Sequence, residues 1–193
     1  MKKTGWIILG VIVVLVLWVF SGYNGMVSEQ EAATTELSNM QAQYQRRADM
    51  MPQLAKIVKA YAKHEKETFE EVTKARASVG QVKLDVNNLT EASMKQYAAA
   101  QGELANAFSK LMLVAERYPE LKASENFKAL QVQEEGTENR ISEARRKYNE
   151  AVQNYNQTVR KMPSALIAGL FNFNVMPKFE AAAGAEKAPD LDI

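Results

Sequence analysis

The sequence predicts an all-α protein, with an N-terminal transmembrane helix followed by an elongated antiparallel (up-down) four-helix bundle. Three observations support this prediction. An uncharged apolar run lies near the N-terminus, apolar residues then recur every three or four positions, and no segment shows the period-two alternation typical of a strand. Only five prolines and nine glycines occur in 193 residues, so few positions would interrupt long helices.

The first predicted element is a membrane span within residues 1–23. The run from Trp6 to Phe20 is uncharged, and with its flanking residues it approaches the ~20 residues that cross ~30 Å of hydrocarbon. Trp6 and Trp18 lie near its ends, where aromatic rings prefer the membrane interface. A cleaved signal peptide is the alternative, but its apolar region is usually shorter, and only Val19-Phe20-Ser21 weakly resembles a cleavage site.

Charges beside the span predict its orientation. Lys2 and Lys3 precede it, whereas the first charges after it are Glu29 and Glu31. The positive-inside rule then places the N-terminus in the cytoplasm and the following domain on the outer side of the membrane.

The helical domain is predicted to occupy residues 24–179. Pro52 is expected to end the first helix, and Asn88 with Glu91 three residues later resembles a capping box that opens the third. Pro119 should end the third helix and Pro163 the fourth, which Ser124 or a neighbour would cap. The helices predicted from these boundaries are 24–50, 52–86, 90–117, 124–162 and a short one at 164–173.

The C-terminal region divides into two parts. The apolar segment 164–173 is expected to fold back on the bundle. A second interpretation makes it an interfacial helix of a membrane-shaping protein. Residues 180–193 are predicted to be disordered, because large apolar residues are almost absent from them.

Composition argues against several classes of function. A net charge of +1 gives little reason to expect a nucleic-acid partner, and the absence of cysteine excludes disulfides and thiol catalysis. His64 is the single histidine, and Thr68 stands where an HExxH zinc motif needs its second one. We therefore expect no catalytic residues, no metal site and no cofactor, and hence a protein that is not an enzyme.

Polar residues on or near the apolar stripes predict a structural network inside the bundle. Buried charges are costly unless they are paired, so arginines and carboxylates from different helices should meet. The alternative is an open carboxylate–arginine pocket that would bind a ligand or metal in a sensor or enzyme. The candidate residues are Arg46, Arg47, Glu65, Glu116, Glu138, Asn139, Arg140 and Arg145.

Several distinctive motifs follow one another along nearly the whole chain to Phe179. They are Tyr23-Asn24, Arg46-Arg47-Ala48-Asp49-Met50-Met51-Pro52-Gln53-Leu54, Tyr61-Ala62-Lys63-His64-Glu65, Glu116-Arg117-Tyr118-Pro119-Glu120-Leu121-Lys122 and the run from Thr137 through Tyr148-Asn149 to Tyr155-Asn156. In these residues and in their order, the chain resembles the LemA family of bacterial membrane proteins. The resemblance implies an N-terminal anchor and an elongated helical bundle, and it implies no reaction.

The leading functional hypothesis is a non-catalytic scaffold or adaptor in the bacterial cytoplasmic membrane. Its expected partners are the lipid bilayer, further copies of itself and an unidentified membrane protein. The first helix should extend past the others near the membrane, so that Tyr23, Met26 and Ala33 would lack partners within the chain. Exposed apolar surface usually marks an interface, which predicts a homo-oligomer held through the span and this stalk.

Overall fold

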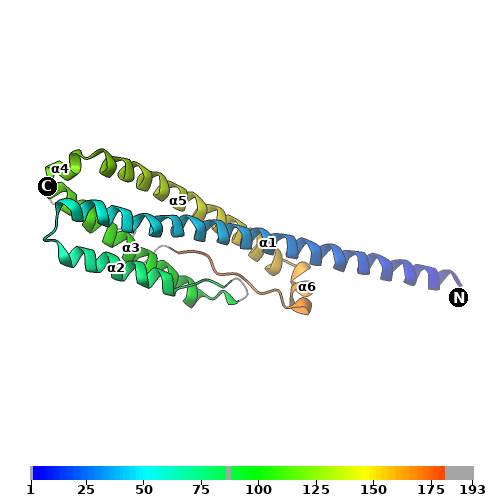
Figure 1. The fold of residues 1–193 in the computed structure, drawn as a ribbon. Coiled ribbons are helices and arrows are strands. Elements are labelled where there is room, and N and C mark those ends of the chain that lie inside the picture. The colour runs from blue at the N-terminus through cyan, green and yellow to red at the C-terminus, as the bar shows by residue number, and fades with distance from the viewer. Residues whose placement is uncertain (1, 86–87, 181–193) are drawn as a thin grey trace, which may run out of the picture.

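The structure is a computed structural model, and it describes residues 2–85 and 88–180. Every regular element in these residues is a helix, so the prediction of an all-helical fold is confirmed (Figure 1). The predicted disordered tail lies outside the described residues, apart from Glu180. The helices are α1 (Lys2–Tyr61), α2 (Lys66–Gln81), α3 (Glu91–Arg117), α4 (Pro119–Ala123), α5 (Glu125–Arg160) and α6 (Ser164–Phe171).

Helix α1 dominates the shape of the molecule. It is 60 residues long, or about 90 Å at 1.5 Å per residue, and its N-terminal part extends beyond all the other helices (Figure 1). Within the described residues it is the one helix long and apolar enough to cross a membrane. The side chains from Trp6 to Phe20 are largely exposed, whereas from Met26 onward one face of the same helix is buried.

The predicted helix boundary at Pro52 is wrong, because α1 continues through it to Tyr61. Pro52 lies on the exposed side of the helix, while Met51, Leu54 and Val58 keep the opposite side buried without a break. A proline inside a helix costs about 3 kcal/mol, and burial of this continuous apolar face offsets that cost. The chain turns instead at residues 62–65, so the predicted helix 52–86 is divided between α1 and α2.

The N-cap of helix α3 lies two residues after the predicted cap at Asn88. Thr90 is its N-cap: the Thr90 side chain accepts from the Ser93 backbone N–H at 3.1 Å, and the Ser93 hydroxyl accepts from the Thr90 N–H at 3.0 Å. This is a reciprocal capping box in which serine takes the place of the usual Glu or Gln. Helix α4 then forms one short turn that starts at Pro119, where a missing N–H does no harm.

The helices pack around three clusters of buried apolar residues along the length of α1. The distal cluster joins α1 to α2, α3, α4 and α5, and the central one joins α1, α3 and α5. The third cluster, nearest the exposed part of α1, contains Met26, Tyr155, Val159, Ile167 and Ala168. Helix α1 packs mainly along α5, and α2 packs mainly along α3.

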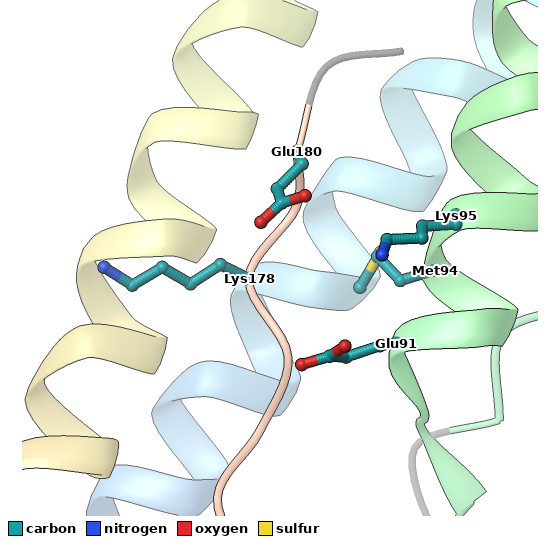
Figure 2. A pocket seen from close by; sticks show the side chains of 5 residues that line it. All are labelled: Glu91, Met94, Lys95, Lys178 and Glu180. Carbon is teal, nitrogen blue, oxygen red and sulfur yellow. The ribbon is translucent and has the colours of Figure 1, made fainter. Parts of the chain in front are cut away.

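Helix α6 folds back on α5 and α1 and lies against α1 where the exposed apolar part ends (Figure 1). Gly22 permits this close approach, since a Cβ there would lie 2.5 Å from Cδ1 of Ile167. The following residues, 172–180, run as an extended segment between α5 and α3, which we call the strap (Figures 1 and 2).

The predicted unpartnered stalk is not present. Met26 and Ala33 are fully buried within the chain, and the Tyr23 ring packs edge-on against Phe171 and Phe173 at 4.9 and 5.5 Å. The expectation is wrong because α5, α6 and the strap reach nearly to the end of the exposed apolar run. These stalk residues therefore offer little surface to a second copy of the chain.

Candidate functional site

A buried guanidinium occupies the middle of the domain. Helix α1 places Arg47, which is 2% exposed, between α3 and α5. Its Nη1 donates to Oε1 of Glu138 at 2.5 Å, and its Nη2 donates to the backbone carbonyl and the side-chain Oε1 of Gln101 at 2.8 and 3.1 Å. These contacts compensate for the cost of removing the charge from water, and they tie three helices together.

Aromatic rings and a second arginine extend this network by one helical turn. Arg145 donates from Nε to the Tyr44 hydroxyl at 2.6 Å, and its guanidinium lies 5.1 Å from the Phe179 ring of the strap. The Tyr44 ring meets Tyr97 of α3 edge-on, with centroids 5.4 Å apart. Burial raises the pKa values of both tyrosines, against the opposing effect of the nearby arginines, so their hydroxyls stay protonated.

A groove opens between α3 and α5 beside Arg47. It encloses about 490 Å³, and we call it the α3–α5 groove. Glu134 lines it although the residue is only 5% exposed, and its carboxyl makes no hydrogen bond or ion pair. Burial, followed by the charge of Glu138, raises the pKa of Glu134 to about 7, while Arg47 opposes the shift. The residues that line the groove are Ala105, Phe108, Ser109, Glu134, Glu135, Glu138 and Asn139.

The candidate residues from the sequence fall into three groups. Arg47, Glu138 and Arg145 meet in the central network, the last through Tyr44. Glu65 and Glu116 lie at the distal end, where Glu65 pairs with Arg117 at 3.1 Å and Glu116 with Lys122 at 2.5 Å. The side chains of Arg46, Asn139 and Arg140 are exposed.

Sequence reasoning left four members out of the candidate set: Tyr44, Tyr97, Gln101 and Glu134. All four occupy positions on the apolar stripes. A polar residue on such a stripe signals burial, which makes Glu134 recognisable in the sequence as a polar stripe position, and Gln101 could have been chosen on the same ground. Nothing in the periodicity indicates which helix supplies the partner.

A repeated Tyr-Asn pair on α5 holds the strap. The Asn149 side chain exchanges two hydrogen bonds with the backbone of Phe179, at 2.9 and 2.8 Å. Asn156 does the same with Met176, at 2.8 Å for both bonds. The hydroxyls of the preceding tyrosines, Tyr148 and Tyr155, donate to strap carbonyls three residues apart, at 2.7 and 2.9 Å.

The spacing of these contacts follows from elementary geometry. Asn149 and Asn156 are seven residues apart, which is about 10.5 Å along a helix. Their partners, Phe179 and Met176, are three residues apart, which is about 10 Å along an extended chain. The two repeats therefore stay in register, and α5 recognises the strap through the backbone of the strap.

A small hollow separates the other side of the strap from α3, as Figure 2 shows. The hollow is lined by Glu91, Met94, Lys95, Lys178 and Glu180.

Among residues 2–85 and 88–180, no group of three or more His, Asp or Glu side chains is placed to hold a metal ion. The central network instead consists of paired charges, amide groups and aromatic rings. It holds α1, α3 and α5 in one register and leaves one carboxyl facing an open groove.

The fold and this network define an all-helical protein with one N-terminal helix apolar enough to span a membrane. The LemA family model matches residues 36–192, and the chain belongs to the LemA family. The resemblance found in the sequence motifs is thereby confirmed.

Three relatives are named as magnetosome proteins. Over 84% of its length the chain is 27% identical to magnetosome protein MamQ of Magnetospirillum gryphiswaldense. Over 82% of its length it is 25% identical to magnetosome proteins MamQ 1 and MamQ 2 of Paramagnetospirillum magneticum. The matches span 66% and 64% of those proteins, just under two thirds of their lengths.

Proposed function

We propose that this protein is a non-catalytic adaptor of the bacterial cytoplasmic membrane, anchored by a single span. The observation that carries the proposal is the continuity of α1. The helix that exposes Trp6 to Phe20 also supplies one wall of the domain from Met26 to Val58, without an intervening linker. A domain built on its own anchor has a fixed distance and tilt relative to the bilayer, as a scaffold for other membrane proteins requires.

Helix α6 supports the same proposal. Leu166 and Leu170 are 62% and 71% exposed, and α6 packs against α1 immediately after the apolar run. Apolar side chains at the level where a span leaves the membrane are suited to the headgroup boundary. Arg160 and Lys161, both exposed, lie just before α6 and could meet anionic headgroups. In this proposal α1, α2, α3 and α5 form an up-down four-helix bundle that stands on the bilayer.

The orientation is a part of the proposal that can be tested directly. We propose a cytoplasmic N-terminus and a domain on the outer side, from Lys2 and Lys3 before the span and Glu29 and Glu31 after it. Because the chain has no cysteine, Leu113→Cys on the exposed face of α3 gives a single label site.

A membrane-impermeant maleimide should label Leu113→Cys in intact spheroplasts and Lys3→Cys only after lysis. The opposite pattern would reverse the orientation. The chain should also sediment with membranes after alkaline washing and enter the soluble fraction only with detergent. Recovery in the soluble fraction without detergent would exclude an anchored adaptor.

Self-assembly is proposed to occur through the span, since the stalk residues are buried within the chain. Single cysteines placed in turn from Trp6 to Phe20 should give cross-linked dimers along one helical face. A cysteine in place of exposed Glu103, far from the span, serves as the matched control. If no span position gives a dimer, assembly with a different membrane protein becomes the better account.

The α3–α5 groove favours a second candidate function, a sensor that binds a small ligand. Glu134 is buried, makes no hydrogen bond or ion pair and faces this open groove. A purely structural network would be expected to pair each of its charges. This candidate is compatible with the adaptor role, because the groove and the exposed apolar run are separate parts of the molecule.

A further inference from the structure

Glu134 combines two properties that rarely occur together. The residue is 5% exposed, and its carboxyl oxygens keep some contact with solvent but take part in no hydrogen bond or ion pair with the described residues. Buried carboxyls are normally satisfied by donors, because desolvation penalises an unpaired charge. Its carboxyl therefore lies ready for a donor that enters the groove from outside.

The groove provides a place for such a donor. Glu134 and Glu138 lie four residues apart on α5, so their side chains are neighbours on one face. Across from them α3 contributes Ala105, Phe108 and Ser109. One wall is thus acidic and the other largely apolar, and the enclosed volume of about 490 Å³ exceeds that of an amino-acid side chain.

The balance of charge in the groove specifies the sign of the ligand. Arg47 and Glu138 form an ion pair, so their charges cancel. Glu134 is left without a counter-ion, and Glu135 adds a second carboxylate at the exposed rim. Ala105, Phe108 and Ser109 bring no cation from α3. An anionic ligand would meet repulsion here, whereas a cation would neutralise a charge that the protein leaves unbalanced.

We propose that the α3–α5 groove binds an alkylammonium group, with its nitrogen between Glu134 and Glu138 and its alkyl chain along Ala105 and Phe108. An ammonium is a compact charge on a slim stem, which suits a carboxyl on a residue that is only 5% exposed better than a planar guanidinium does. The group comes either from a free alkylamine or from a lysine side chain of a partner protein. This proposal rests on the sensor candidate and is independent of membrane anchoring.

Binding should depend on pH through Glu134. The groups around its carboxyl are Glu138 and Glu135 on α5 and Arg47 on α1, and α3 offers no titratable group in the groove. The ammonium requires ionised Glu134, whose pKa of about 7 leaves it mostly protonated at pH 6 and mostly ionised at pH 8. Alkylamines stay charged over this range, so affinity should be about tenfold higher at pH 8.

Isothermal titration calorimetry on the full-length chain in nanodiscs tests the proposal. The probes are 1,5-diaminopentane for a free amine, a helical peptide with one lysine for a partner side chain, and 1-pentanol as the uncharged control. At least one of the two amine probes should bind saturably, with tenfold weaker affinity at pH 6 than at pH 8. Whichever amine probe binds more tightly identifies the source.

Two variants complete the test. Glu134→Gln should weaken binding at least tenfold and abolish its pH dependence, while Glu103→Gln, which removes an exposed charge outside the groove, should change neither. Glu134→Gln removes a buried charge, so the variant is expected to fold. The proposal is overturned if neither amine binds, if 1-pentanol binds equally well, or if Glu134→Gln binds as the parent chain does. None of these results would change the outcome expected from the membrane topology experiment, so the two proposals can fail separately.

Discussion

Two charged residues, Arg47 and Glu134, are buried side by side in the described part of the chain. Arg47 is 2% exposed, whereas the side chain of its partner Glu138 is 45% exposed. Water can therefore solvate Glu138 if the pair is broken, but it cannot reach Arg47. Burial and the charge of Glu138 raise the pKa of the nearby Glu134 to about 7, so its carboxyl is only partly ionised near neutral pH. The two glutamates thus have different effects on stability, and substitutions can separate them.

Glu134→Gln should make the stability of the domain less sensitive to pH. The pKa of Glu134 is raised from 4.5 to about 7 in the folded state, so the folded chain binds more protons between these values. Stability is then greatest below about pH 4.5 and falls as pH rises through 7. The full shift corresponds to about 3 kcal/mol, which solvent at the groove mouth reduces to roughly 1–3 kcal/mol.

Denaturant melts of the detergent-solubilised chain provide the measurement. The Gln variant should be more stable than the parent at pH 8 and nearly equal to it at pH 4.5. Glu135→Gln, at the adjacent exposed position, should show no such difference. An equal effect of Glu134→Gln at both pH values would mean that Glu134 is ionised throughout.

Glu138→Ala should destabilise the domain less than the loss of one partner of a buried ion pair usually does. Burial and, second to it, the charge of Glu138 raise the pKa of Glu134. Without Glu138 the second effect is lost, so Glu134 ionises more readily and can balance Arg47. We expect a loss of roughly 1–2 kcal/mol at pH 8, against the ~3–5 kcal/mol typical of such changes.

The double variant Glu134→Gln/Glu138→Ala removes both counter-ions of Arg47. Its loss of stability at pH 8 should exceed the sum of the single changes by more than about 2 kcal/mol. A control cycle with Glu135→Gln in place of Glu134→Gln should be additive within about 0.5 kcal/mol. Additivity in both cycles would show that Glu134 does not compensate for Glu138.

Among the structural elements, the strap depends most clearly on specific side chains. Asn156→Ala removes both hydrogen bonds to the backbone of Met176, and we expect a loss of about 1–3 kcal/mol. Asn154→Ala is the matched control: Asn154 is exposed on the same helix, and its change should be within about 0.5 kcal/mol.

Trypsin offers a second measurement, since Lys178 lies within the strap. Cleavage after Lys178 should be faster in Asn156→Ala than in Asn154→Ala or the parent chain. If the rates are equal, the hydrogen bonds of Asn156 to Met176 are not what secures the strap.

The helices could be predicted from the sequence because their apolar stripes are long and regular, but two elements could not. The stripe of Leu54, Val58, Tyr61, Glu65 and Thr68 keeps its three-four spacing across the turn at residues 62–65. Periodicity therefore gave no sign of that turn, and Pro52 was the more obvious place for a boundary. The cap at Thr90 was missed because serine replaced the usual Glu or Gln.

The strap was missed for a different physical reason. Its main contacts to α5 use backbone carbonyls, which every residue offers, and backbone N–H groups, which only proline lacks. Its own side chains therefore contain little information. The signal lies instead on α5, in Tyr148-Asn149 and Tyr155-Asn156 seven residues apart. Burial of Arg47 was predictable from its stripe, but its partner Gln101 was not, since pairing depends on the register of different helices.

For the molecule as a whole, the proposed contact of α6 with the bilayer is the most direct prediction. An environment-sensitive dye on Leu170→Cys should show blue-shifted emission when the full chain is reconstituted in vesicles, and lipid-borne quenchers should reach it. The same dye on Leu113→Cys, which is 65% exposed on α3, should report water. Identical spectra at the two positions would place α6 away from the bilayer.

The pairing of α1 with α5 has a consequence for biosynthesis. The first long helix made by the ribosome packs mainly along the last long one, and about 100 residues separate the end of α1 from the end of α5. At about 5–20 residues per second, the central face of α1 waits on the order of 5–20 s for its partner. Helices α2 and α3 can cover its distal part meanwhile, but Met26 must wait for α5 and α6. Insertion of the span during translation would hold this exposed face beside the membrane, away from other nascent chains.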